Sequence, residues 1–269
     1  MKRLRTLSLL VSLLGSVGVP LEAQRPFPYH LQTGREIGLA ASGLALMGAG
    51  TLIGNGQDPL TPDQVRALDR QDVNAFDRGA TRQWSTGAGA ASDIMAYSLL
   101  ASPVALMVTR PGSSVPLTIG VMYAETILVG DGLVQLLKTT TGRTRPYAYN
   151  DDPAIPQEDK ESLHAVRSFP SGHTAHAFMS VVFLNTVYGK LKPDSPLRPW
   201  LWAGSLVAAG TVGYLRYDSG NHFPTDILAG AAIGGLAGWM VPRLHETGAP
   251  QVSIAPSADR ATVLVSLPF

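Results

Sequence analysis

Apolar residues gather into six segments separated by polar stretches, and each segment is long enough to form a helix. Most are shorter than the roughly 20 residues that cross a bilayer comfortably. All are interrupted by glycine or another small residue, which lets helices pack closely in a membrane. We therefore predict an all-α fold, a six-helix transmembrane bundle, with a soluble all-α domain as the alternative. The segments are 37–53, 94–108, 115–137, 174–188, 200–215 and 227–241.

The N-terminus has the pattern of a targeting segment. Three basic residues, Lys2, Arg3 and Arg5, precede a short apolar run over 7–19. A secretory signal peptide has this order, and Ala23 offers a position for cleavage. An uncleaved anchor is the alternative, although the run is short for a membrane span. Either interpretation sends the chain to a bacterial-type secretion pathway.

The last residues differ from the rest because their apolar positions alternate with polar ones. Residues 252–254 and 263–267 follow this pattern around a polar turn, which predicts a short β-hairpin. We therefore divide the chain into four parts. They are a signal peptide or anchor over 1–23, an N-terminal helix with polar surface helices over 24–93, a core over 94–245 and a tail over 246–269.

Composition narrows the classes of function. The 269 residues are 45% apolar and 15% charged, whereas an average soluble domain has roughly 25% charged residues. The net charge of +1 gives no indication of nucleic-acid binding. The sequence contains no cysteine, which excludes disulfides, thiolate catalysis and cysteine-based zinc sites.

Ionisable residues stand at the ends of four of the apolar segments. If neighbouring helices are antiparallel, the end of the third segment, the start of the fourth, the end of the fifth and the start of the sixth lie at one end of the bundle. Burying three cations there is costly unless an anion is bound. Arginine and lysine suit a phosphate-like oxyanion. The residues are Lys138, Arg145, His173, Arg216, His222 and Asp226.

Two local patterns add to this prediction, and each has a simpler interpretation. Ser171 is a good helix N-cap, but the free N–H groups of a helix start also bind anions, and Gly172 would let a ligand approach. Asp226 follows His222 by one turn, so it can bind one imidazole nitrogen and leave the other as a nucleophile. Alternatively, Asp226 caps the sixth helix.

Three motifs carry a family resemblance. They are KTTTGRTRP from Lys138, PSGH from Pro170 and RYDSGNHFPTD from Arg216. In this order and spacing they resemble the signature motifs of the type 2 phosphatidic acid phosphatase and vanadium haloperoxidase superfamily. The resemblance covers about residues 94–241. Leu215 stands where many members have serine, which puts a minor contact in doubt.

The resemblance implies a role for each residue. His222 would attack phosphorus and become a phosphohistidine, with Asp226 orienting it. His173 would protonate the leaving oxygen and later activate water. No metal and no cofactor are implied, because phosphoryl transfer needs mainly positioning and charge stabilisation. The groups implied to hold the phosphoryl oxygens are Lys138, Arg145, Arg216 and the backbone N–H groups of Ser171 and Gly172.

The resemblance also implies the type of reaction. We expect a metal-independent phosphatase that hydrolyses a phosphate monoester or pyrophosphate, with a lipid phosphate as substrate and a membrane as its surroundings. A soluble periplasmic acid phosphatase is the alternative, and a vanadate-dependent haloperoxidase is a weaker one. No nucleic-acid partner is expected.

The loop after the fourth segment predicts the sidedness. It carries Lys190, Lys192 and Arg198, and basic loops stay in the cytoplasm. The opposite end, with the candidate site, then faces the periplasm from the inner membrane. Because an exported N-terminus starts outside, this orientation requires one segment that does not span. We expect 37–53 to lie on or dip into the outer face; a soluble periplasmic protein is the alternative.

For four further polar residues the sequence predicts only the surroundings of the side chain. We expect Arg143 to be a solvated loop cation rather than a ligand. We expect His176 to be a packing histidine, with support of the site from one turn beyond His173 as the alternative. Asp131 either balances the cationic end of the bundle or only pairs with Gln135. Glu125 lies in an apolar segment, where a carboxylate is expensive, so we expect a polar contact for it inside the bundle.

Overall fold

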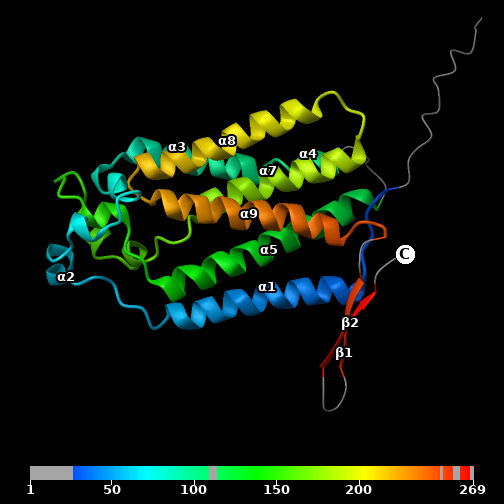
Figure 1. The fold of residues 1–269 in the computed structure, drawn as a ribbon, viewed down its shortest axis with the longest axis horizontal. Helices are drawn as coiled ribbons and strands as arrows, with labels where there is room; N and C mark the ends of the chain where they lie inside the picture. Colours follow the sequence, from blue (N-terminus) through cyan, green and yellow to red (C-terminus); the bar gives the residue numbers. More distant parts are fainter. Residues whose placement is uncertain (1–26, 109–113, 249–250, 257–260, 267–269) are drawn as a thin grey trace, which may run out of the picture.

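The fold is a bundle of long helices that run up and down beside one another (Figure 1). The structure, a computed structural model, describes residues 27–108, 114–248, 251–256 and 261–266, so the predicted signal segment 1–23 lies outside the described residues. Within those ranges the six predicted segments correspond to six long helices. They are α1 (Thr33–Gly54), α3 (Thr86–Ala101), α5 (Val115–Thr141), α7 (Gly172–Leu191), α8 (Arg198–Asp218) and α9 (Pro224–Leu244).

Short helical turns fill the connections. α4 (Val104–Met107) continues the direction of α3, whereas the others lie mainly at the end of the bundle where α5 finishes (Figure 1). They are α2 (Pro62–Arg66), α6 (Gln157–Lys160), η1 (Arg70–Asp72), η2 (Arg78–Arg82), η3 (Pro146–Tyr149) and η4 (Leu163–Val166).

The second long helix begins earlier than the apolar pattern indicates. Its first turn follows Ser85, whose side chain accepts a hydrogen bond from the backbone N–H of Ala88. Residues 86–93 are glycine, alanine and polar residues, so hydropathy alone places the start at 94. The earlier start matters because it brings Ser92 and Asp93 into the helix, next to α8.

α7 forms the centre of the bundle, with Met179, Val181 and Phe183 fully buried. α9 lies directly against it along a stripe of glycines. A Cβ atom at Gly230, Gly234 or Gly238 would come within 2.4, 2.2 or 2.4 Å of a backbone carbonyl oxygen of α7 or of its N-cap residue. Only glycine permits this approach, and small residues at every fourth position favour it in membrane helices. The stripe therefore sets the spacing between the starts of α7 and α9.

α1 packs lengthwise against α5, which corrects the expectation that 37–53 lies on the membrane surface (Figure 1). A Cβ atom at Gly132 of α5 would lie 2.6 Å from the carbonyl oxygen of Gly43, and one at Gly50 would lie 2.8 Å from the backbone nitrogen of Leu136. Gly43 and Gly50, two of the glycines that make this segment look like a weak span, are thus residues that let it join the bundle.

The predicted membrane character is confirmed in part. Among the described helices, four stretches are long and apolar enough to cross a membrane: Thr33–Gly54, Thr86–Met107, Val115–Tyr149 and Pro224–Leu244. α7 and α8 do not reach this level of hydropathy. α7 carries His173, His176 and Asn185, and α8 carries Arg198 and Arg216.

The C-terminal tail forms the predicted hairpin. β1 (Gln251–Pro256) pairs antiparallel with β2 (Ala261–Ser266), with Val252 opposite Val265. It lies at the end of the bundle away from α2 (Figure 1).

Candidate functional site

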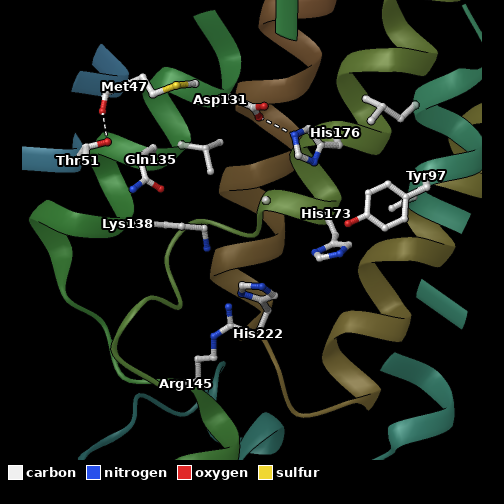
Figure 2. A pocket seen from close by; sticks show the side chains of 14 residues that line it. Met47, Thr51, Tyr97, Asp131, Gln135, Lys138, Arg145, His173, His176 and His222 are labelled. Carbon is white, nitrogen blue, oxygen red and sulfur yellow. Dashed lines mark hydrogen bonds and ion pairs between the residues drawn. The ribbon is translucent and has the colours of Figure 1, made fainter. Parts of the chain in front are cut away.

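A cavity of about 500 Å³ opens at the end of the bundle where the motif residues converge (Figure 2). α5 supplies Lys138, the start of α7 supplies Gly172 and His173, and the connections supply Arg145 and His222. These five of the eight predicted site residues line the cavity. Ser171, Arg216 and Asp226 are buried and do not line the cavity, but Asp226 lies against the lining residue His222.

His222 and Asp226 form the predicted pair. Nδ1 of His222 lies 3.5 Å from Oδ2 of Asp226, and the two side chains are 1% and 0% exposed. This is ion-pair distance and is longer than a hydrogen bond. Oδ2 of Asp226 also accepts hydrogen bonds from the Ser168 hydroxyl at 2.5 Å and from the backbone N–H of Phe223 at 2.9 Å. Asp226 therefore caps α9 and faces His222 at the same time.

The protonation state of His222 follows from its surroundings. Burial lowers the pKa of His222 well below its ordinary 6.5, and the charges of Arg145, Lys138 and Arg216 lower it further. The imidazole is therefore neutral at neutral pH. Since Nδ1 faces Asp226, the Nε2 atom is the one available to a ligand in the cavity.

Arg143 is not the solvated loop cation that the sequence suggested. It donates to Oδ1 of Asp226 at 2.5 Å, to the Thr225 hydroxyl at 2.7 Å and to Oδ2 of Asp77 at 2.8 Å. Its guanidinium carbon also lies 4.1 Å from the centre of the Phe223 ring. Arg143 thus holds two buried carboxylates together, one of which faces the candidate nucleophile.

Asp77 belongs to the polar stretch before α3, and no sequence pattern singles it out. It is fully buried and accepts bonds from the backbone N–H and the hydroxyl of Thr225. Burial by itself would raise the pKa of Asp77, but hydrogen bonds from Thr225, Arg143 and Asn74 outweigh it and hold the pKa below its ordinary value. Asp77 is therefore ionised and anchors the start of α9.

Asp93 is a second residue that sequence reasoning missed. Its Oδ1 atom lies 3.0 Å from Nε2 of His173 and 3.2 Å from Nη1 of Arg216. Arg216 is 7% exposed and also donates to the Ser92 hydroxyl at 3.1 Å. One carboxylate therefore orients the candidate general acid and partly balances a buried cation.

Lys138, Arg145 and Arg216 do not use all of their hydrogen-bond donors within the protein. The Lys138 ammonium donates to the carbonyl oxygen of Arg167 at 3.0 Å, and Nη1 of Arg145 donates to Oδ1 of Asn221 at 2.8 Å. The Nε atoms of Arg145 and Arg216 are buried without a hydrogen-bond partner. Buried donors are normally paired, so their presence beside the cavity indicates that the site is built for an anion.

The start of α7 corrects one detail of the expected anion site. The Ser171 hydroxyl caps the helix by accepting from the backbone N–H of Thr174 at 3.4 Å. The backbone N–H of Ser171 already donates to the carbonyl oxygen of Asp226 at 2.9 Å, so it is not available to a phosphoryl oxygen. Gly172 lines the cavity, and its N–H belongs to the first turn of α7, where helices leave donors free.

A second histidine–carboxylate pair lines the cavity wall. Nε2 of His176 lies 2.6 Å from Oδ1 of Asp131 (Figure 2), so His176 is not simply a packing residue and Asp131 pairs with it. Tyr97 approaches the His173 ring edge-on at 6.3 Å. Met47, Leu100 and Val134 add apolar surface to the same wall.

Comparisons with known proteins show the family of this chain. A family profile described as PAP2 superfamily matches residues 119–249. The chain is similar to the bacitracin transport permease protein BcrC of Bacillus licheniformis, with 30% identity over 57% of this chain and 70% of the relative. It is also 33% identical to the lipid A 4'-phosphatase of Bacteroides thetaiotaomicron over 45% of this chain, which covers 51% of that relative.

Two more similarities are weaker. The undecaprenyl-diphosphatase of Sulfolobus acidocaldarius is 24% identical over 53% of this chain and 61% of its own length. A solved transmembrane PAP2 type phosphatidylglycerolphosphate phosphatase from Bacillus subtilis shares 22% identity, with a TM-score of 0.41 over 77% of this chain and 90% of that chain. The profile match and the similarity to the permease together establish that this chain belongs to the PAP2 superfamily.

Proposed function

We propose that the protein is a phosphoric ester hydrolase that cleaves a phosphate monoester or pyrophosphate of a lipid through a phosphohistidine on His222. The observation that carries the proposal is a buried, neutral His222 that faces a cavity lined by Lys138 and Arg145, with the third cation, Arg216, buried behind it. Two of these cations, Arg145 and Arg216, have buried donors without partners. Such donors stabilise charge on the phosphoryl oxygens, which is the main requirement of phosphoryl transfer.

The first step forms the covalent intermediate. The Nε2 lone pair of His222 attacks phosphorus, and the bond between phosphorus and the leaving oxygen breaks. His173 gives its proton to that oxygen. Burial and the charge of Arg216 lower the pKa of His173 to about 4, and the Asp93 carboxylate at 3.0 Å opposes this shift by stabilising the protonated imidazole that the transfer requires. Asp226, beside Nδ1 of His222, stabilises the positive charge that the attacking ring acquires.

The second step releases phosphate. His173, now neutral, takes a proton from a water molecule whose oxygen attacks phosphorus. The phosphorus–nitrogen bond breaks, and His222 returns to its neutral form. Lys138, Arg145 and Arg216 supply positive charge in both steps, so the proposed reaction is independent of a metal.

A lipid leaving group agrees with the surroundings of the cavity. Its wall combines apolar residues of α1, α3 and α5 with the polar pair His176 and Asp131. These three helices are among the stretches able to cross a membrane. Two relatives bear the names lipid A 4'-phosphatase and undecaprenyl-diphosphatase, so we infer an amphiphilic phosphate for this chain as well.

The test is an assay of the purified protein in detergent against phosphatidic acid, phosphatidylglycerophosphate, undecaprenyl pyrophosphate, lipid A phosphate and a soluble aryl phosphate. We expect kcat/KM for at least one lipid to exceed that for the soluble ester, and His222→Ala to be inactive. A preference for the soluble ester would favour an acid phosphatase. Halide oxidation with vanadate and peroxide, without phosphatase activity, would refute the proposal.

The intermediate gives a second test. Rapid mixing with ³²P-labelled substrate and quenching in base should trap an acid-labile phosphohistidine in the wild-type protein. His173→Ala should accumulate less product while His222→Ala forms no adduct. Full turnover by His222→Ala would contradict the nucleophile assignment.

We further propose that the site faces the periplasm. The loop between α7 and α8, with Lys190, Lys192 and Arg198, lies at the opposite end of the bundle from the cavity (Figure 1), and basic loops favour the cytoplasm. Since α1 runs through the bundle, this orientation requires the N-terminal side of α1 to be cytoplasmic. It is therefore incompatible with export and cleavage of residues 1–23.

Cysteine labelling tests the orientation, because the native sequence has no thiol. Asp151, whose side chain is 94% exposed, lies at the cavity end, and exposed Pro196 lies in the basic loop. In intact spheroplasts an impermeant maleimide should label Asp151→Cys, and it should label Pro196→Cys only after lysis. The opposite pattern would place the site in the cytoplasm and restore the signal-peptide interpretation.

A further inference from the structure

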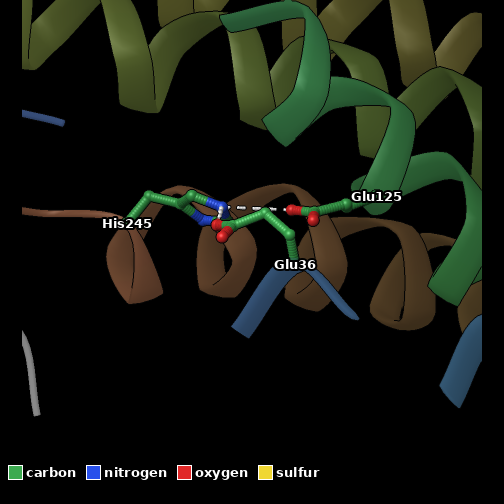
Figure 3. A group of neighbouring side chains, drawn as sticks. All are labelled: Glu36, Glu125 and His245. Atoms are coloured by element: carbon green, nitrogen blue, oxygen red, sulfur yellow. Dashed lines mark ion pairs between the residues drawn. The ribbon is translucent and has the colours of Figure 1, made fainter. Parts of the chain in front are cut away.

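Three ionisable side chains converge at the end of the bundle away from the phosphate site (Figure 3). Glu36 comes from the first turn of α1, Glu125 from α5 and His245 from the C-cap of α9. Their side chains are 17%, 6% and 0% exposed. Along α5, Glu125 lies about 20 Å from Lys138, so the group is separate from the catalytic cavity.

Hydrogen bonding fixes the ring of His245. Its Nδ1 atom lies 2.8 Å from the carbonyl oxygen of Val241, and a carbonyl can only accept, so Nδ1 carries a proton. In the neutral ring, Nε2 then presents a lone pair toward the two glutamates, 3.1 Å from Oε1 of Glu36 and 3.1 Å from Oε2 of Glu125. Histidines that ligate metals are held by this kind of bond from the other ring nitrogen.

A proton on Nε2 of His245 would not complete the hydrogen bonding of these three side chains. Nε2 of His245 and Oε2 of Glu125 are both buried without a hydrogen-bond partner, because neither glutamate oxygen lies along the N–H direction of the ring. Arg35 donates to Oε1 of Glu36 at 3.1 and 2.9 Å, and Oε2 of Glu36 has no partner. Nε2 of His245 and Oε2 of Glu125 therefore face each other as buried acceptors without a donor, and Oε1 of Glu36 lies 3.1 Å from the same nitrogen. This arrangement is costly unless a cation lies between them.

We propose that Glu36, Glu125 and His245 bind a divalent transition-metal cation, with Zn²⁺ as the fitting member of the class. Zinc bonds to nitrogen and oxygen are about 2.0–2.2 Å long. At tetrahedral angles they place neighbouring ligand atoms roughly 3.3 Å apart, close to the two distances of 3.1 Å seen here. One imidazole with two carboxylates suits Zn²⁺ better than Mg²⁺ or Ca²⁺, which prefer oxygen ligands alone.

The metal would link the first and last long helices of the described bundle. The segment before α1 already contacts the end of α9, since the backbone N–H of His30 donates to the carbonyl oxygen of His245 at 3.1 Å. Arg35 also donates to the carbonyl oxygen of Leu244 at 2.6 Å. A metal on Glu36, Glu125 and His245 adds a cross-link between α1, α5 and α9, so its role is to stabilise the bundle rather than to take part in phosphoryl transfer.

Metal content and thermal unfolding of the full chain in detergent test the proposal. After treatment with a chelator, the wild-type protein is equilibrated with ZnCl₂, passed through gel filtration and analysed by mass spectrometry for bound zinc. We expect one more Zn²⁺ per chain in the wild type than in Glu36→Gln or Glu125→Gln. At a hundredfold excess over Kd, zinc should raise the Tm of the wild type by roughly 5–10 °C more than it raises the Tm of either variant.

One control variant and the choice between two test variants make the outcome decisive. His164→Ala removes an exposed histidine far from the group and should bind zinc as the wild type does. Zinc bound to the histidines of the catalytic cavity is common to all variants and cancels in the comparison. Glu36 is partly exposed, so Glu36→Gln tests the site even if Glu125→Gln does not fold. Equal zinc content in the wild type and Glu36→Gln, or no bound zinc in either, would overturn the proposal.

Discussion

Replacing Arg143 by methionine should be one of the most damaging changes outside the motif histidines. Methionine keeps an unbranched apolar stem against Phe223 but removes the charge and the bonds to Asp226 and Asp77. Both carboxylates are fully buried, and Arg143 itself is 26% exposed. Removing one partner of such a buried pair costs about 3–5 kcal/mol, because the remaining charge stays desolvated. The same loss displaces Asp226 from His222, so we expect activity to fall as well.

The effect should depend on pH through Asp77. Its pKa in the folded protein is lowered, partly by the bond from Arg143. This carboxylate therefore contributes stability above its unfolded pKa of about 3.9, and the contribution is lost as the pH falls through the lower folded pKa. In Arg143→Met the pKa is lowered less. The stability difference from the wild type should thus be largest near neutral pH and smaller at about pH 3.

The assay is unfolding in detergent, followed by circular dichroism, at both pH values. Arg66→Met is the matched control, because Arg66 pairs with Asp63 on the surface, where the side chains are 70% and 87% exposed. Such a pair contributes less than about 1 kcal/mol. Arg143→Lys keeps the positive charge but not the guanidinium group, so it separates the effect of the charge from that of the hydrogen-bond geometry. If Arg143→Met were as stable as Arg66→Met, or if its deficit were the same at both pH values, the assignment of Arg143 would be refuted.

Four further predictions follow from individual contacts. Asp93→Asn should lower kcat by about a hundredfold or more, since a positioned general acid contributes that much, and it should change KM less because the cations remain; an unchanged kcat would exclude Asp93 from orienting His173. The acidic limb of the kcat/KM profile should lie below pH 6.5, because the lowered pKa keeps His222 neutral there; a limb near 6.5 or above would contradict this. Gly234→Leu should prevent folding, because even a Cβ atom meets a carbonyl oxygen at 2.2 Å, whereas Gly235→Leu, at a position with open space, should fold; both are checked by gel filtration. Vanadate should inhibit competitively, whereas EDTA should leave kcat per folded molecule unchanged while lowering Tm; EDTA inhibition reversed by a divalent ion would indicate a metal in the reaction.

Local sequence patterns predicted the six long helices and most of the candidate site. Hydropathy depends on local composition, and the motif residues lie at helix ends, where a reversal of chain direction brings Lys138, His173 and His222 to one end of the bundle. The same reasoning could not find Arg143, Asp77 or Asp93 as partners. Their contacts join residues 66, 83 and 123 positions apart, and such pairs have no spacing that a sequence pattern can reveal.

Tertiary packing also determined the role of the glycines in residues 37–53 and the contacts of Glu125. In the sequence, the glycines of residues 37–53 suggest a weak membrane span, because glycine lowers hydropathy and helix propensity. In the bundle, Gly43 and Gly50 allow α1 to lie against α5 at backbone distance. That contact brings Glu36 within reach of Glu125 and His245. A local sequence pattern indicates the hydropathy and the helix propensity of each residue. Only the packing of the helices determines which side chains come into contact.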